Sequence, residues 1–443
     1  MWIDELTNLL DGRSKIVRDT STVERLSKDA YWYSPILYEE LYEKKAECIV
    51  FPLNENEVQE VVVFAVKKKI PLTIRGSGTG NYGQAIPLEG GIVIDITKMD
   101  QTVNTTNEAV TVQAGKRLGV LEKEMRKQNK ELRIFPSTFM KSTVSGFLCG
   151  GSGGIGSIRW GNLWDDNVNY VKIMTIEETP QILHIYGEEV LHYIHNYGTT
   201  GILLEAGLPL EEKMNWKQML LTFEEFSNAV SYCGHLADRN DISLRLLSTC
   251  EWPLPLHYKP LEKYINNGES LVILETTADK EKIAESVQQF LGKVTYYIPA
   301  EKYQKGLKLS DFTWNHSTLW AHKNGENMTY LQARFDSKKL EEQIEVIKKE
   351  YQDEVQLHFE FIKIEGEVTP AALPVLKFYS TERIYEVIDF FERHGIQINN
   401  PHTYLLGFGG YNLRMDEIKS KKEKYDPHGL LNPGKIPKAK EII

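Results

Sequence analysis

Two glycine-rich stretches are the first residues in this 443-residue chain whose types and spacing indicate chemistry. The first, residues 71–91, reads PLTIRGSGTGNYGQAIPLEGG, and the second lies in CGGSGGIGSIRWG. The spacing G-x-G-x-x-G occurs in both, at Gly78, Gly80 and Gly83 and again at Gly151, Gly153 and Gly156. It is typical of a turn that binds a dinucleotide diphosphate, because glycine permits positive φ and lets a phosphate approach the backbone.

The residues that follow each stretch argue against a nicotinamide-binding Rossmann turn. That turn needs a helix directly after its last glycine, because the diphosphate sits on the N-terminus of the helix. The first stretch continues with QAIPLEGGIVIDI and the second with SIRWGNLWDDN, and neither has a helical pattern or the G-K-[ST] of a P-loop. We expect two loops whose backbone amides cradle a phosphate without a helix, the alternative being tight turns alone.

Polar side chains on apolar strands of the second half are candidates for catalysis. In VQLHFEFIKI, strand alternation places His358 and Glu360 on the face opposite to Phe359. In TYLQARF, Arg334 lies on the polar face of a strand. The guanidinium of Arg334 suits a substrate carboxylate, and His358 suits a hydroxyl proton. A solvated sheet face is the alternative for these residues.

Several short elements must position the first glycine-rich stretch. ECIVFP, PLTIR and GIVIDIT read as strands, and NENEVQEVVVFAVKKK between the first two reads as a helix. This helix begins with Asn54 and Glu57 at the spacing of a capping box. Residues 136–170 are rich in Gly, Ser, Asn and Trp with little periodicity, which predicts a long functional loop.

The second half of the chain has a different order of predicted strands and helices. MLLTF, SLRLLST, SLVILETT and VQLHFEFIKI read as strands, and helices are predicted over 279–291, in KKLEEQIEVIKKEY and in TERIYEVIDFFERHG. Thr222 and Glu225 have the spacing of another capping box. This order predicts an α+β layer, an antiparallel sheet with helices on one face.

The composition of the chain argues against several classes of function. The net charge is −10, which argues against a general binder of nucleic acid or anionic membranes. The N-terminal residues lack a signal-peptide core, and the apolar runs are too short for a membrane span. The four cysteines form no C-x-x-C pair and no metal-ligand spacing, so we expect reduced thiols in a cytoplasmic protein without a metal site.

Four ordered motifs resemble the vanillyl-alcohol-oxidase-like flavoproteins, also called FAD-linked oxidases. FPLNENEVQEVVVFAVKKKIPLTIRGSGTG is similar to their helix and pyrophosphate loop, and FPSTFMKSTVSGFLCGGSGGIGSIRWG to their second flavin-contacting segment. YGTTGILLEAGLPL is similar to a Thr-Gly-Ile strand of the family. The tail KSKKEKYDPHGLLNPGKI resembles the closing motif of the glycolate and 2-hydroxy-acid dehydrogenase branch.

The resemblance implies an α+β fold, with a PCMH-type FAD-binding domain of two α+β subdomains over residues 1–210, completed by 411–443. Residues 211–410 would form the substrate domain, with its antiparallel sheet covered by helices on one face. The residues implied to hold FAD are Arg75, Gly76, Ser77, Gly78, Thr79, Gly80, Pro136, Ser137, Thr143, Gly146, Gly153, Gly154, Gly201, Ile202 and, beside the isoalloxazine, Asn432.

The resemblance also bears on catalysis. NNPHTYLLGFGGYN resembles a segment of some FAD-linked oxidases, which implies that His402 and Tyr404 lie near the flavin ring. Two departures from the pattern are Ser145 and Trp160, which replace the usual Gly and Tyr. RGSGTGNYG lacks the histidine of covalent members and Cys149 is not at their cysteine position, so we expect non-covalent FAD. The His-x-Gly-Asp-Gly-Asn-x-His stretch of metal-dependent relatives is absent from the sequence.

The resulting expectation is an FAD-dependent oxidoreductase that takes hydride from an alcohol or hydroxy-acid type of substrate. The electron acceptor stays open between oxygen, a quinone and a partner protein. An NADPH-driven reductase with the same flavin fold is one alternative, although such enzymes have a different tail. A flavin-binding or electron-transfer protein without turnover is the other.

Overall fold

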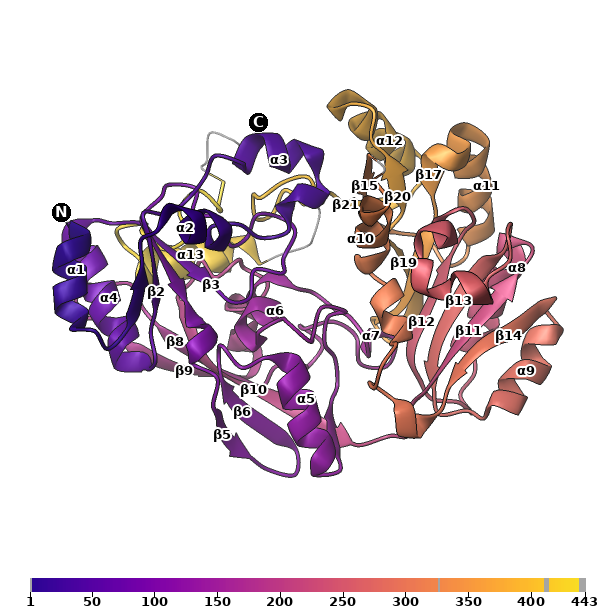
Figure 1. Ribbon diagram of the computed structural model, residues 1–443, viewed down its shortest axis with the longest axis horizontal. Helices are drawn as coiled ribbons and strands as arrows, with labels where there is room; N and C mark the ends of the chain where they lie inside the picture. The colour runs from indigo at the N-terminus through magenta and orange to yellow at the C-terminus, as the bar shows by residue number, and fades with distance from the viewer. Residues whose placement is uncertain (1, 326, 410–413, 438–443) are drawn as a thin grey trace. The chain divides into compact units, whose positions relative to one another are not determined.

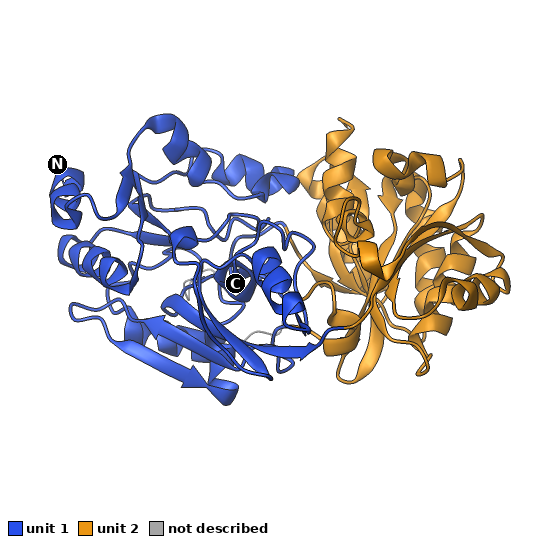
Figure 2. Cartoon of the chain, turned by 60° about the horizontal axis from the view of Figure 1, so that its bottom comes forward, with its two compact units in different colours: residues 1–152, 163–213, 402–443 blue, residues 153–162, 214–401 orange. Residues whose placement is uncertain are grey.

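The computed structural model describes residues 2–325, 327–409 and 414–437. The chain forms two compact units (Figure 2). Unit 1 comprises residues 1–152, 163–213 and 402–443, and unit 2 comprises residues 153–162 and 214–401. The second glycine-rich stretch is therefore divided, because its last part, from Gly153, belongs to unit 2.

Unit 1 starts with a small mixed sheet that carries the first glycine-rich stretch. Its strand order is β1 (Lys15–Val17), β2 (Cys48–Phe51), β4 (Ile92–Asp95) and β3 (Leu72–Arg75). The pairs β2–β4 and β3–β4 are parallel, and β1–β2 is antiparallel. The glycines begin directly after β3, at the carboxyl end of a parallel strand, where ligands of open α/β sheets commonly bind.

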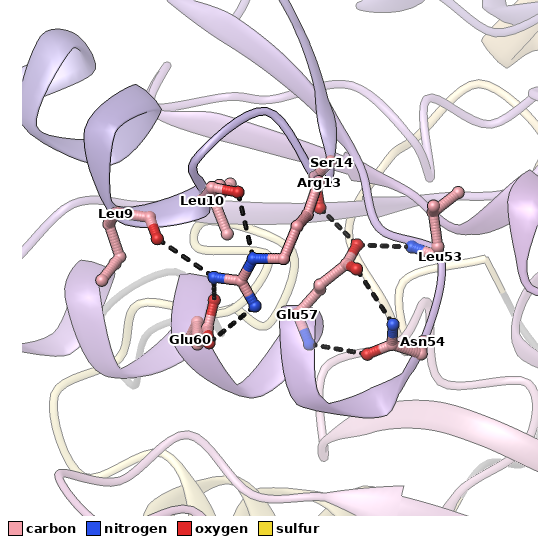
Figure 3. A network of polar contacts seen from close by, with 8 residues as sticks. All are labelled: Leu9, Leu10, Arg13, Ser14, Leu53, Asn54, Glu57 and Glu60. Atoms are coloured by element: carbon pink, nitrogen blue, oxygen red, sulfur yellow. Dashed lines mark hydrogen bonds and ion pairs between the residues drawn. The ribbon is translucent and has the colours of Figure 1, made fainter.

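Helix α4 (Glu55–Lys68) connects β2 to β3 and confirms the predicted capping box (Figure 3). The side-chain oxygen of Asn54 accepts the amide of Glu57 at 3.1 Å, and Asn54 Nδ2 donates to Glu57 Oε1 at 2.9 Å. The second oxygen of Glu57 accepts the amide of Leu53 at 2.8 Å and the hydroxyl of Ser14. The cap therefore also fixes the chain that leads from β1 into the sheet.

A second sheet of unit 1 is antiparallel. Its order is β5 (Thr102–Thr105), β6 (Ala109–Gln113), β10 (Ile202–Glu212), β8 (Tyr170–Met174) and β9 (Ile182–Tyr186), with β7 (Lys130–Leu132) paired to β10. The helices of unit 1 are α1 (Trp2–Leu10), α2 (Thr20–Leu26), α3 (Pro35–Leu41), α4, α5 (Leu118–Lys127), α6 (Val144–Gly150) and α13 (Met415–Tyr425) (Figure 1).

The expectation of a long loop over residues 136–170 is wrong in part. Helix α6 lies inside it, with Thr143 as its N-cap, and the short helix α7 (Ser157–Trp160) follows in unit 2. In VSGFLCG the buried Val144, Phe147 and Leu148 do have helical spacing, but the helix is only seven residues long, so the periodic signal is short.

Unit 2 is built on an antiparallel sheet. The strand order is β14 (Gly292–Ile298), β11 (Lys217–Phe223), β13 (Ser270–Thr276), β12 (Leu244–Cys250), β18 (His358–Ile364), β19 (Glu367–Ala372), β16 (Gln332–Arg334) and β21 (Gln397–Asn399). A second small sheet joins β15 (Met328–Tyr330), β20 (Val375–Lys377) and β17 (Val355–Gln356). The larger helices are α8 (Phe226–Ala237), α9 (Lys280–Gln288), α10 (His316–Lys323), α11 (Leu340–Tyr351) and α12 (Thr381–Arg393).

The predicted α+β class is confirmed, with helix α8 packed on β11, β12 and β13 and α9 on β14 (Figure 1). The predicted capping box of Thr222 and Glu225 is wrong. Thr222 lies within β11, and Glu225 precedes α8 without a side-chain cap. The strand continues through Thr222 because its backbone pairs with both β13 and β14.

Candidate functional site

A cleft in unit 1 gathers most of the predicted FAD-binding loops. Its empty volume is about 680 Å³, open mouth included. Three segments form most of its walls, namely the first glycine-rich stretch, helix α6 with its N-cap, and the loop that leads into β10, and Asp29 comes from a fourth. The lining residues are Asp29, Ile74, Gly76, Ser77, Gly78, Thr79, Gly80, Gln84, Ala85, Thr143, Ser145, Gly146, Cys149, Gly150, Tyr197, Gly198, Gly201 and Leu203.

The glycines on the first wall are required by space as well as by conformation. A Cβ at Gly76 would overlap the hydroxyl of Thr143, and one at Gly80 would lie 2.5 Å from Gln84 Oε1. Gly78 has φ +61, which L-residues rarely adopt. The backbone is therefore bare on this wall, which fits the close approach of a diphosphate.

Arg75 holds this loop through hydrogen bonds to backbone carbonyls and does not line the cleft. Its guanidinium is buried and donates to the carbonyl oxygens of Leu26 at 2.7 Å and Gly76 at 2.9 Å. Burial lowers the pKa of Arg75, and the nearby carboxylates of Asp95 and Asp29 oppose that shift. The charge of Arg75 is used to fasten two segments of chain beside the cleft.

The second wall is the first turn of α6. Thr143 Oγ1 accepts the amide of Gly146 at 3.2 Å, which is the N-cap hydrogen bond. Ser145, one of the departures from the family pattern, lines the cleft and donates its amide to the carbonyl of Ala114 at 3.0 Å. The Gln84 side chain links this wall to the first, because its Nε2 donates to the carbonyl of Gly150 at 3.2 Å.

The C-terminal tail ties the third wall to the first. Asn432 Oδ1 accepts the amide of Ile74 at 3.2 Å, while its Nδ2 donates to the carbonyls of Tyr197 at 2.9 Å and Gly198 at 2.8 Å. Asn432 is buried, and its own amide donates to the carbonyl of Leu72 at 2.7 Å. Asn432 thus fixes the distance between two walls and is not among the cleft-lining residues.

Five other residues predicted to hold FAD do not line the cleft of unit 1. Ile202 begins β10 as a fully buried residue, directly after the cleft-lining Gly201. Pro136 and Ser137 form the turn in which the amide of Phe139 donates to the Pro136 carbonyl at 2.9 Å. Gly153 and Gly154 belong to unit 2.

Sequence reasoning missed three polar residues of the cleft: Asp29, Gln84 and Tyr197. Asp29 comes from a segment without any glycine motif, although its buried carboxylate accepts the amides of Tyr31 at 3.0 Å and Ala85 at 3.2 Å. Burial raises the pKa of Asp29 to about 6. Gln84 lies within the first glycine-rich stretch, and its position directly after G-x-G-x-x-G was the available signal.

In unit 2, His358 and Glu360 meet in a buried polar cluster. His358 Nε2 lies 2.9 Å from Glu360 Oε1 and 3.1 Å from the hydroxyl of Ser248. Glu360 Oε1 also accepts the Ser248 hydroxyl at 2.9 Å and the backbone amide of Trp314 at 2.6 Å. Both side chains are at most 1% exposed, so the alternative of a solvated sheet face is wrong for them.

The other face of β18 follows the prediction. Phe359 stacks on Phe226 of α8, with 6.2 Å between ring centroids, and this side of the sheet is covered by helices. In the tautomer that donates from Nε2 to Glu360, Nδ1 of His358 carries the lone pair. Among the described residues, neither His358 Nδ1 nor Glu360 Oε2 has a hydrogen-bond partner.

Arg334 lies on the same side of the sheet as Glu360, because both residues pair with Ala371 of β19. Its side chain is exposed and donates to Gln397 of β21.

The other two predicted catalytic residues, His402 and Tyr404, belong to unit 1. His402 is buried, with Nδ1 2.7 Å from the hydroxyl of Ser34, and Tyr404 packs beside Leu41 and Ile86.

The described residues contain neither a metal-binding cluster nor a membrane-spanning helix. Within residues 2–325, 327–409 and 414–437, no group of three or more His, Cys, Asp or Glu residues is arranged to hold a metal ion. Over the same part of the chain, every helix is too short or too polar to cross a membrane.

Comparisons with known proteins agree with this geometry. Residues 46–182 match the family described as FAD binding domain. A D-lactate dehydrogenase of Archaeoglobus fulgidus is 26% identical over 316 residues, which are 68% of each chain. A glycolate oxidase subunit of Bacillus subtilis is 25% identical over 200 residues, 43% of this chain and 42% of that protein.

Two solved structures have a similar fold. An alkyldihydroxyacetonephosphate synthase superposes with a TM-score of 0.72 at 16% identity, covering 98% of this chain and 84% of that one. A BBE-like 1 variant of Physcomitrella patens gives a TM-score of 0.68 at 14% identity, covering 97% and 98%. The chain therefore contains an FAD binding domain over residues 46–182, and it shares its fold with these two solved structures.

Proposed function

We propose that this protein oxidises a 2-hydroxy acid, with FAD bound non-covalently in the cleft of unit 1 and the substrate handled by unit 2. The observation that carries the proposal is the cleft of unit 1, where the first glycine-rich stretch, the first turn of α6 and the loop that leads into β10 come together. The related D-lactate dehydrogenase and glycolate oxidase subunit supply the substrate class. FAD, when bound, supplies the acceptor for the hydride.

Non-covalent binding is supported by the thiol that lines the cleft. Burial raises the pKa of Cys149 to about 12, so this thiol stays protonated at neutral pH and is a poor nucleophile. The first wall carries no histidine between Arg75 and Gly83. All four cysteines are free thiols, which also supports the proposal of a cytoplasmic protein.

The proton of the substrate hydroxyl is assigned to His358. Glu360 fixes the tautomer of this histidine, and its Nδ1 can accept a proton directly or through one water. The imidazolium that forms is then stabilised by the Glu360 carboxylate. Arg334 is assigned to the substrate carboxylate, because a guanidinium can bind a carboxylate through two hydrogen bonds and its partner Gln397 is neutral.

The test has two steps. The purified protein should be yellow, and the flavin should pass a filter after denaturation. Anaerobic mixing with D-lactate or glycolate should then bleach the flavin absorbance. His358→Gln should slow this reduction by at least about a hundredfold, whereas His394→Gln, at an exposed histidine that ends α12, should not. Retention of FAD with no bleaching by any 2-hydroxy acid would overturn the proposed substrate class.

A further inference from the structure

Two oppositely charged side chains are buried where the glycine-rich loop turns back, at residues 83–85. The ammonium of Lys435, in the tail, is fully buried and donates to the carbonyl of Gly83. The carboxylate of Asp29 lines the cleft and accepts the amide of Ala85 at 3.2 Å. The two charges therefore fasten neighbouring backbone groups of the same turn, one from the tail and one from the N-terminal segment.

The other charges that act on this pair are few. Asp29 is the charged group that favours the protonated form of Lys435. The positive charges of Lys435 and of Arg75 on β3 lower the pKa of Asp29 and so oppose the effect of burial. Lys28 precedes Asp29 in the sequence. Burial lowers the pKa of Lys435 to about 7 and raises that of Asp29 to about 6. Both shifts favour the uncharged forms of the two side chains.

We propose that Lys435 and Asp29 make the binding of FAD proton-linked, because the diphosphate on the glycine wall draws a proton from solvent onto this buried pair. The inference rests on the FAD site described above. Negative charge brought next to Asp29 favours the protonated form of both groups, so each has a higher pKa in the complex than in the free protein. Linkage then requires the affinity for FAD to be greatest at low pH and to fall as pH rises through neutrality.

Calorimetric titration of the apoprotein with FAD tests this directly. In buffers of different ionisation enthalpy near pH 7.5, binding should take up a fraction of a proton, on the order of one half. The logarithm of Kd should rise between about pH 6.5 and pH 8.5 with a slope between about 0.3 and 1 per pH unit. Lys435→Met and Asp29→Asn should each lower this slope, because each removes one of the two groups that take up the proton.

Lys424→Met is the matched control, since it removes the same charge from an exposed position in the same tail and should keep the wild-type slope. If Lys435→Met fails to fold, Asp29→Asn decides alone, because it removes charge while keeping an oxygen that accepts hydrogen bonds. Wild-type binding without proton uptake, or an unchanged slope in both variants, overturns the inference. A wild-type protein that binds no FAD at any pH refutes the proposed FAD site instead.

Discussion

Replacing Gly76 by alanine tests whether the two walls of the cleft meet as closely as the structure indicates. The new Cβ would overlap Thr143 Oγ1, whereas the next atoms, Thr143 Cβ and Gly146 Cα, lie 3.3 and 3.6 Å away. Gly76 does not have positive φ, so the penalty comes from this contact alone. Overpacking of this kind costs about 1–3 kcal/mol. We expect the affinity for FAD to fall by about 5- to 150-fold.

The overlap with a single hydroxyl allows a sharp control. Thr143→Ala removes that oxygen and, by losing the N-cap of α6, should cost about 1 kcal/mol of stability by itself. In this background Gly76→Ala should have almost no further effect. Thr143→Val keeps a methyl group of similar size in place of the hydroxyl, so Gly76→Ala should remain harmful there.

These effects are measured by titration with FAD and by thermal melting. The proteins compared are wild type, Gly76→Ala, and the Thr143→Ala and Thr143→Val variants, each with and without Gly76→Ala. Contacting residues are expected to be non-additive, and here the coupling should nearly cancel the cost of the Gly76 substitution. An equal loss in the Thr143→Ala and wild-type backgrounds would refute the argument that this contact shapes the wall.

Three further outcomes follow from the described contacts. Glu360→Gln should lower the rate of flavin reduction while leaving FAD affinity unchanged, because Glu360 acts through His358; stopped-flow reduction together with titration by FAD checks this. Asn432→Ala should leave two buried carbonyls without their donor and cost about 1–3 kcal/mol, seen as FAD loss and a lower urea midpoint. Asn54→Ala should cost about 1 kcal/mol in urea unfolding without changing the substrate dependence of flavin reduction.

Sequence reasoning was reliable where a signal and its partner lie close together in the chain. Asn54 and Glu57 are three residues apart, and their cap forms as the spacing predicts. The same spacing at Thr222 and Glu225 gave a wrong cap, because long-range pairing of β11 with two neighbours extends the strand over Thr222. Local patterns therefore predict local structure only when tertiary pairing does not compete.

The parts of the site that sequence could not predict depend on residues distant in the chain. Asp29 reaches Ala85 across 56 positions, and Asn432 reaches Ile74 across 358. Alternation correctly put His358 and Glu360 together on one side of β18, but it could not tell a buried cluster from a solvated face. That distinction needed Ser248 and Trp314, which come from other elements.

The placement of Asn432 has a consequence for how the protein is made. Two walls of the cleft, at Ile74 and at Tyr197, are joined through a side chain that the ribosome delivers after all of unit 2. A nascent chain therefore carries the glycine loops for most of its synthesis without the bond that sets their separation. FAD capture should accordingly be a late event, and pulse-labelled nascent chains should acquire flavin-dependent protease resistance only once the tail has emerged.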